Sequence, residues 1–225
     1  MRKLEFYEFV GVVAPGALLL FGLANIFQDV NSLLHDKQIT FGELGLFLIL
    51  AYIAGHLVQG IGNGVERVWW ACSGGWPTDW VRTGKHQILA PAQLKILPLR
   101  VQENLRISCP DQLSDLGKSE WWNITRQAYA AVKKAGMSGR VDTFNGNYGM
   151  FRGIAASLVV LLCVALAELE SHNYRMYGVL AVAAGLALLR MHRFGVHYAR
   201  ELFVQFLNLV PGESKAMKKE AADEL

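Results

Sequence analysis

Five polar side chains recur at helical spacing inside an apolar segment: Tyr52, His56, Gln59, Asn63 and Glu66. They stand at i, i+4, i+7, i+11 and i+14, so a helix would carry all five on one face. Such a face can line a water-filled conduit or relay protons. It can equally form hydrogen bonds between packed helices. Both uses require partners, because lipid cannot satisfy polar groups.

His56 has three possible uses on this face. A single histidine among packed helices is most often a hydrogen-bonded structural group. A pore-lining or proton-relay role comes second, and metal binding is the least favoured. Interhelical polar contacts contribute only about 0.6 kcal/mol each on average. Because that is little reason to keep five on one face, the stripe shifts the interpretation toward a conduit.

Glycines accompany the polar stripe and leave the rest of this helix with little side-chain bulk. Pairs of small residues four apart allow helix backbones to approach closely. One such pair, Gly60 and Gly64, occurs here, and another, Gly149 and Gly153, occurs at the start of a later apolar segment. We therefore predict close helix packing at Gly55, Gly60, Gly64, Gly149 and Gly153.

The chain has none of the common enzyme signatures: it lacks His-Glu-x-x-His, Gly-x-Ser-x-Gly, a Walker loop and Cys-x-x-Cys. His192 and His197 are five residues apart, about 140° around a helix, and cannot readily share a metal. We predict no catalytic residue, no cofactor and no metal. The sequence favours a non-enzymatic role.

The elements that position the stripe are membrane helices. Only 18% of the residues are charged, against about 25% in average proteins. Four apolar segments approach the length of about 20 residues that a bilayer requires. They run from Phe9 to Phe27, from Leu44 to Ile61, from Gly153 to Ala167 and from Met176 to Leu189. The predicted fold class is all-α, a four-helix polytopic membrane protein.

Lysine and arginine follow the positive-inside rule across all four segments. The two short loops carry only Lys37 and Arg175, whereas the long middle segment and the tail are rich in basic residues. Both termini and the middle segment are therefore predicted to face the cytoplasm. The basic balance does not require nucleic acid as a direct partner.

Five parts follow along the chain. We predict membrane helices 1 and 2 in residues 1–71, a helical cytoplasmic insert in 72–150, membrane helices 3 and 4 in 151–190, an amphipathic cytoplasmic helix in 191–210 and a disordered tail in 211–225. Within the insert, the clearest helix runs from Ser119, its predicted N-cap, to Ala135. Trp121, Trp122 and Tyr129 on this helix are candidates for binding a soluble partner, if they face solvent.

Pro15 and Gly16 lie within the first apolar segment. Proline inside a helix frees a carbonyl group and bends the axis. A kink packed against a neighbour is favoured over a broken helix that lines a transport site, because no matching second break occurs.

The layout of two helices, an insert, two helices and a basic amphipathic tail resembles small four-helix membrane proteins of bacterial anti-phage defence systems. The residues behind the resemblance are Gly55-His56-Leu57-Val58-Gln59-Gly60-Ile61-Gly62-Asn63, Tyr148-Gly149-Met150-Phe151-Arg152, Arg193-Phe194 and Tyr198-Ala199-Arg200-Glu201-Leu202-Phe203. The resemblance implies a bacterial inner-membrane location and a role as a membrane-perturbing effector or as an anchor for a sensor partner.

Three hypotheses follow. The first is an oligomeric inner-membrane effector, whose partners are the bilayer and copies of itself. The second is a non-conducting scaffold that recruits a soluble cytoplasmic protein. The third is a small transporter or membrane enzyme.

Overall fold

The computed structural model describes residues 6–27, 41–168 and 174–209, and these residues form only helices and their connections. The predicted tail, 211–225, lies outside the described residues. The long helices are α1 (Phe6–Ile26), α3 (Phe41–Cys72), α7 (Gly139–Ala167) and α8 (Tyr174–Leu207). The shorter ones are α4 (Pro77–Thr83), α5 (Pro91–Leu105), the 3₁₀ turn η1 (Leu113–Asp115) and α6 (Lys118–Lys134).

The four long helices contain the four predicted apolar segments, and each is long and apolar enough to cross a bilayer. α3 has 32 residues and spans about 48 Å at 1.5 Å per residue. This exceeds a hydrocarbon core of about 30 Å. The all-helical class and the count of four apolar helices are therefore confirmed.

Two predicted boundaries do not interrupt the helices. α8 runs unbroken from Tyr174 to Leu207, so the fourth apolar segment and the predicted amphipathic helix are one element. No proline interrupts it, and its glycines cost only about 1 kcal/mol each relative to alanine. α7 likewise begins at Gly139, well before residue 151. Apolar patterning detects the stretch suited to lipid, whereas backbone hydrogen bonding continues beyond it.

The chain divides into two compact units. The first unit comprises Met1–Cys72 and Asn145–Phe194, and the second comprises Ser73–Phe144 and Gly195–Leu225. α1 and α3 therefore belong to the first unit, whereas α4, α5 and α6 belong to the second. α7 and α8 contribute residues to both.

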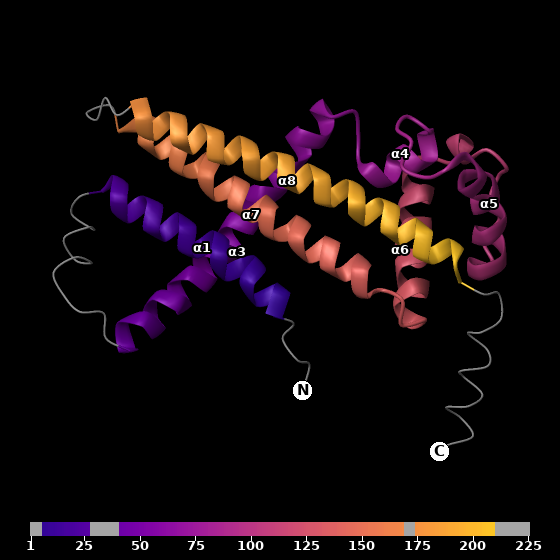
Figure 1. The fold of residues 1–225 in the computed structure, drawn as a ribbon, viewed down its shortest axis with the longest axis horizontal. Coiled ribbons are helices and arrows are strands. Elements are labelled where there is room, and N and C mark those ends of the chain that lie inside the picture. Colours follow the sequence, from indigo (N-terminus) through magenta and orange to yellow (C-terminus); the bar gives the residue numbers. More distant parts are fainter. Residues whose placement is uncertain (1–5, 28–40, 169–173, 210–225) are drawn as a thin grey trace, which may run out of the picture. The chain divides into compact units, whose positions relative to one another are not determined.

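Within the first unit, α1 and α3 cross in direct backbone contact (Figure 1). A methyl group added at Gly16 would collide with the carbonyl oxygen of Ala51, and one added at Gly55 would collide with that of Val12. Backbones approach this closely only where side chains are missing. α1 continues through Pro15 without a break, so the broken helix is not observed, and the bend at Pro15 stays a prediction.

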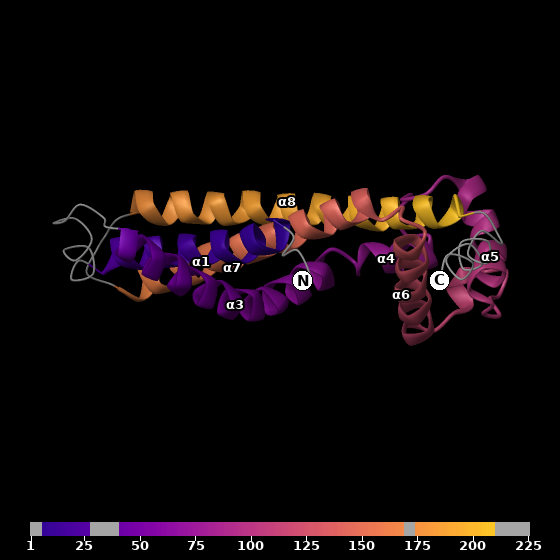
Figure 2. The same ribbon diagram turned by 90° about the horizontal axis from the view of Figure 1, so that it is seen from below.

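α7 and α8 run side by side in the first unit, as two views show (Figures 1 and 2). Ala155 and Leu158 of α7 form a buried cluster with Ala184 and Ala187 of α8. The rings of Phe151 and Phe194 stack with centroids 5.5 Å apart. Small residues at the seam let the two helices lie close together.

The second unit has its core along one side of α6. Ile124, Ala128 and Val132 are buried at helical spacing, and Trp121 stacks on Phe203 of α8 at 5.3 Å. The N-cap of α6 is Gly117, not the predicted Ser119, which lies inside the first turn. The Glu120 carboxylate accepts the Gly117 N–H at 2.9 Å. A carboxylate at this position replaces the hydroxyl cap that the sequence suggested.

Candidate functional site

Gln59 is the first residue of the site, and its partner is created by Pro15. A helical residue normally donates its N–H to the carbonyl four residues earlier. Proline has no N–H, so Pro15 leaves the carbonyl of Gly11 without its helical donor. The Gln59 Nε2 atom of α3 donates to that Gly11 oxygen at 3.0 Å. The carbonyl group that lacks its helical donor in α1 is thereby hydrogen-bonded by a side chain of α3.

The same amide joins α3 to α7. Gln59 Nε2 also donates to the carbonyl of Gly149 at 3.2 Å. Its Oε1 accepts from Arg152, at 2.9 Å from Nη2 and 3.3 Å from Nε. A glutamine amide offers two donors and an acceptor oxygen, so all of its hydrogen-bonding groups are used. Gln59 thus links three helices.

Glu66 forms the charged part of the site, two turns along α3 from Gln59. It is buried, with 5% of its surface exposed. One carboxylate oxygen accepts from Arg152 Nη1 at 2.9 Å, and the other accepts from the Tyr148 hydroxyl. The indole N–H of Trp70 in turn donates to the Tyr148 oxygen at 2.8 Å. Pairing of the two charges, with further hydrogen bonds, offsets the cost of removing them from water.

α8 joins the site through His192, which contacts Trp69 and Trp70 of α3. Trp69 Nε1 donates to His192 Nδ1 at 3.2 Å. The imidazole lies against Trp70, with ring centroids 4.9 Å apart. We name the seven side chains the polar network: Gln59, Glu66, Trp69, Trp70, Tyr148, Arg152 and His192. It connects all four long helices within the first unit.

The network splits the predicted polar stripe. At about 100° per residue, Gln59 and Glu66 lie about 20° and 40° to one side of Tyr52, and Asn63 and His56 lie about 20° and 40° to the other. The buried residues Gly55, Val58 and Gly62 lie further around on the Glu66 side. Gln59 and Glu66 therefore contact neighbouring helices, whereas Tyr52, His56 and Asn63 are exposed.

We name the exposed part the open face of α3: Tyr52, His56, Gly60, Asn63 and Gly64. The Tyr52 and His56 rings contact one another edge to face at 4.6 Å. A Cβ atom added at Gly60 or Gly64 would meet nothing within 4 Å. These glycines pack against no described part of the chain. A Cβ atom added at Gly149 would also meet nothing within 4 Å, but Gly149 is half-buried and its carbonyl accepts from Gln59.

The remaining predicted glycines lie at close contacts. Gly55 is at the crossing with α1. A Cβ atom at Gly153 would come within 2.7 Å of the Pro15 ring and 2.9 Å of Gln59 Nε2. The Ser157 hydroxyl, one turn along α7, lies 2.8 Å from the Pro15 carbonyl and can donate to it. The Pro15 segment of α1 is thus covered by small residues of α7.

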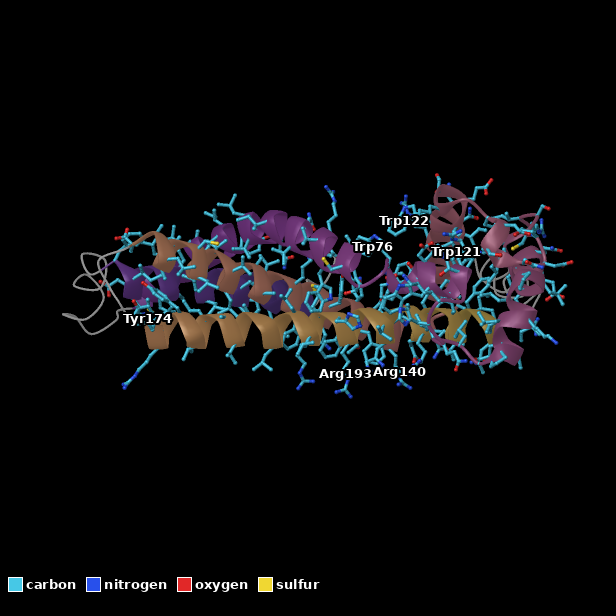
Figure 3. The ribbon with its side chains drawn as sticks, turned by 90° about the horizontal axis from the view of Figure 1, so that it is seen from above. Trp76, Trp121, Trp122, Arg140, Tyr174 and Arg193 are labelled. Atoms are coloured by element: carbon cyan, nitrogen blue, oxygen red, sulfur yellow. The ribbon has the colours of Figure 1, made fainter. Side chains whose placement is uncertain are left out.

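The three predicted partner-binding residues have different environments. Trp121 is buried, and its indole donates to the carbonyl of Thr78 at 2.8 Å. Tyr129 is half-buried and donates its hydroxyl to Asp142 at 2.6 Å. Trp122 is 57% exposed and marked on α6 in Figure 3. Trp122 is therefore the member of the trio that is open to a partner.

Sequence reasoning missed Tyr148, Arg152, Trp70 and His192 as members of one site. A signal was present: a buried carboxylate such as Glu66 requires a cation. Glu66 follows the second apolar segment and Arg152 precedes the third, so helices of alternating direction bring them to the same end. Glu66 and Arg152 are therefore expected at the same depth, whatever the packing of the helices.

Within the described ranges, no group of three His, Cys, Asp or Glu side chains is placed to hold a metal ion. Cys72 and Cys163 are exposed, and Cys109 is buried. Burial, together with the nearby Asp111 carboxylate, raises the pKa of the Cys109 thiol. This thiol stays protonated and unreactive at neutral pH.

No model of a known protein family matches the chain, and comparison with curated proteins and with solved structures finds no similar protein.

Proposed function

We propose that the protein is an inner-membrane effector that acts by assembling in the bilayer through the open face of α3. The observation that carries the proposal is the division of one polar stripe. Gln59 and Glu66 are held within the polar network. Tyr52, His56 and Asn63 are exposed beside two glycines that meet nothing.

The solvent around α3 decides what its exposed polar side chains can do. A lipid-facing helix gains nothing from a histidine and an asparagine, because hydrocarbon provides no hydrogen-bond partner. A second copy provides both donors and acceptors. Gly60 and Gly64 form a small-xxx-small pair that allows two backbones to approach closely. Self-association through this face would provide hydrogen-bond partners for His56 and Asn63 and a packing surface for the two glycines.

The effector role follows from the chemistry of the assembled face. Copies that meet along Tyr52, His56 and Asn63 create a polar seam within an apolar region. Water can enter such a seam, and ions can follow it. The second unit is proposed to lie in the cytoplasm and to receive the signal. The basic residues of the middle segment support that orientation.

The test is leakage of a trapped dye from liposomes that contain the purified full chain, with oligomeric state measured in nanodiscs. The informative variants are Gly60→Leu and Asn63→Leu. The matched control is Gly178→Leu on α8, because Gly178 is also exposed and also meets nothing within 4 Å. We expect wild type and control to assemble and to leak, and the two α3 variants to lose both properties. A monomeric wild type, or unaltered leakage in both variants, contradicts the proposal.

A scaffold role is the second candidate, and one observation favours it: Trp122 is largely exposed on the second unit. The burial of Trp121 weakens it, since a docking site of three aromatic residues is reduced to one. Assembly without any leakage, together with loss of a captured cytoplasmic protein in Trp122→Ala, would favour the scaffold.

A further inference from the structure

Two large aromatic side chains of the second unit are exposed. Trp76 is 44% and Trp122 57% exposed. They belong to the same part of the unit, because Trp121 at the start of α6 bonds the carbonyl of Thr78 at the start of α4. Each exposed tryptophan is one or two residues from that bond, and Figure 3 marks both. Exposed aromatic residues that gather in one part of a surface are typical of a contact site.

The outer face of α6 adds positive charge to this region. Arg126 and Lys133 lie about 40° and 20° around the helix from Trp122, and both are exposed. α6 carries four cationic side chains and a single acidic one, Glu120. Glu120 caps the helix start by accepting the Gly117 N–H. The face therefore combines tryptophan with basic residues and fits a negatively charged surface.

The connection to α3 keeps Trp76 close to the end of a helix long enough to cross a bilayer. α3 ends at Cys72, and Trp76 follows four residues later. Four residues reach at most about 14 Å. Tryptophan prefers the headgroup level of a bilayer, and cations next to a membrane helix bind anionic lipid. The bilayer that we propose around α3 is therefore a surface with the required chemistry.

We infer that the second unit binds anionic phospholipid headgroups, with Trp76 and Trp122 in the headgroup layer and Arg126 and Lys133 on the phosphates. This contact is independent of assembly through the open face of α3. It commits the exposed aromatic residues to lipid and not to a soluble protein. It also gives the second unit a reversible state, since salt or a change of lipid composition releases it.

The test is hydroxyl-radical footprinting of the full chain in three environments. Oxidation is measured for each residue by mass spectrometry. These are nanodiscs of phosphatidylcholine, nanodiscs of phosphatidylcholine with phosphatidylglycerol, and detergent micelles. We expect Trp76 and Trp122 to be protected in the anionic nanodiscs and to regain oxidation at high salt. Ile96 and Leu99, exposed on α5, provide the reference and should not change.

Charge reversal supplies the second arm. A basic residue near an anionic surface contributes about a fivefold change in the docking equilibrium, so Arg126→Glu should lower Trp122 protection by about that factor or more. The matched control is Lys95→Glu, an exposed cation on α5, which should leave protection unchanged. Equal oxidation of Trp122 in all three environments overturns the inference. So does protection of Trp76 alone, protection in micelles as well, or protection that is identical in zwitterionic and anionic nanodiscs.

Discussion

At the scale of single residues, Gln59 shows how a proline can be accommodated inside a membrane-length helix. The carbonyl of Gly11 loses its helical donor because Pro15 has no N–H. In water a solvent molecule would replace that donor, but hydrocarbon has none. Gln59 replaces it from α3 and accepts from Arg152 with its other end. Proline, glutamine and arginine therefore form one interdependent set, although they are far apart in the sequence.

The first prediction concerns this residue. Gln59→Leu leaves the Gly11 carbonyl and one edge of the Arg152 guanidinium without a partner. An unsatisfied buried polar group costs about 1–3 kcal/mol, so we expect a loss of that size in unfolding free energy. Detergent-induced unfolding followed by circular dichroism measures it. Asn63→Leu removes an amide from the exposed side of the same helix and should change stability by far less. Equal losses in the two variants would contradict the assignment of Gln59 to the network.

At the scale of helices, the crossing of α1 and α3 depends on the absence of side chains. Gly16 and Gly55 each face a carbonyl group of the opposite backbone. A backbone cannot yield as the end of a flexible side chain can. The polar network lies beside this crossing and uses Gly11 of α1 and Gln59 of α3. The close approach and the hydrogen bonds are therefore parts of one arrangement.

The second prediction tests the crossing with the smallest possible change. Gly16→Ala and Gly55→Ala each introduce one methyl group into a backbone contact. Overpacking costs about 1–3 kcal/mol, occasionally more, and here we expect the upper part of that range. Gly60→Ala is the control, since Gly60 lies on the same helix with open space around it. The melting temperatures of the three variants are compared in one detergent. A control destabilised as much as Gly55→Ala would contradict the backbone contact between α1 and α3.

At the scale of the whole molecule, the topology that we propose follows from the four apolar helices and the distribution of basic residues. An even number of crossings returns the chain to the side from which it started. Basic residues are concentrated in the middle segment and the tail, and the short loops are poor in them. We therefore propose that the middle segment and both termini are cytoplasmic.

The third prediction is a labelling pattern. A membrane-impermeant maleimide should reach Cys72, which is exposed, only after cells are permeabilised. A Lys37→Cys variant should react in intact cells, because residue 37 follows the first apolar segment. The buried, protonated Cys109 thiol should react slowly in both cases. Labelling of Cys72 in intact cells would reverse the proposed orientation.

Length and apolar composition by themselves determined the helical class and the four long apolar helices, because a bilayer demands about 20 apolar residues per crossing. The spacing of Tyr52, His56, Gln59, Asn63 and Glu66 also established that they share one broad face of α3. These properties depend on neighbours along the chain. A pattern of period 3.6 is therefore sufficient to read them.

Only the tertiary structure decided how that face is divided. Gln59 and Glu66 are held by Gly11, Tyr148 and Arg152, while His56 and Asn63, a small rotation away, are exposed. Periodicity gives the direction of a side chain around its own axis, but it contains no information on which sector a neighbouring helix occupies. That sector is set by the glycine crossing with α1 and by the packing of α7. These contacts join residues far apart in the chain, so the sequence pattern of α3 could not reveal them.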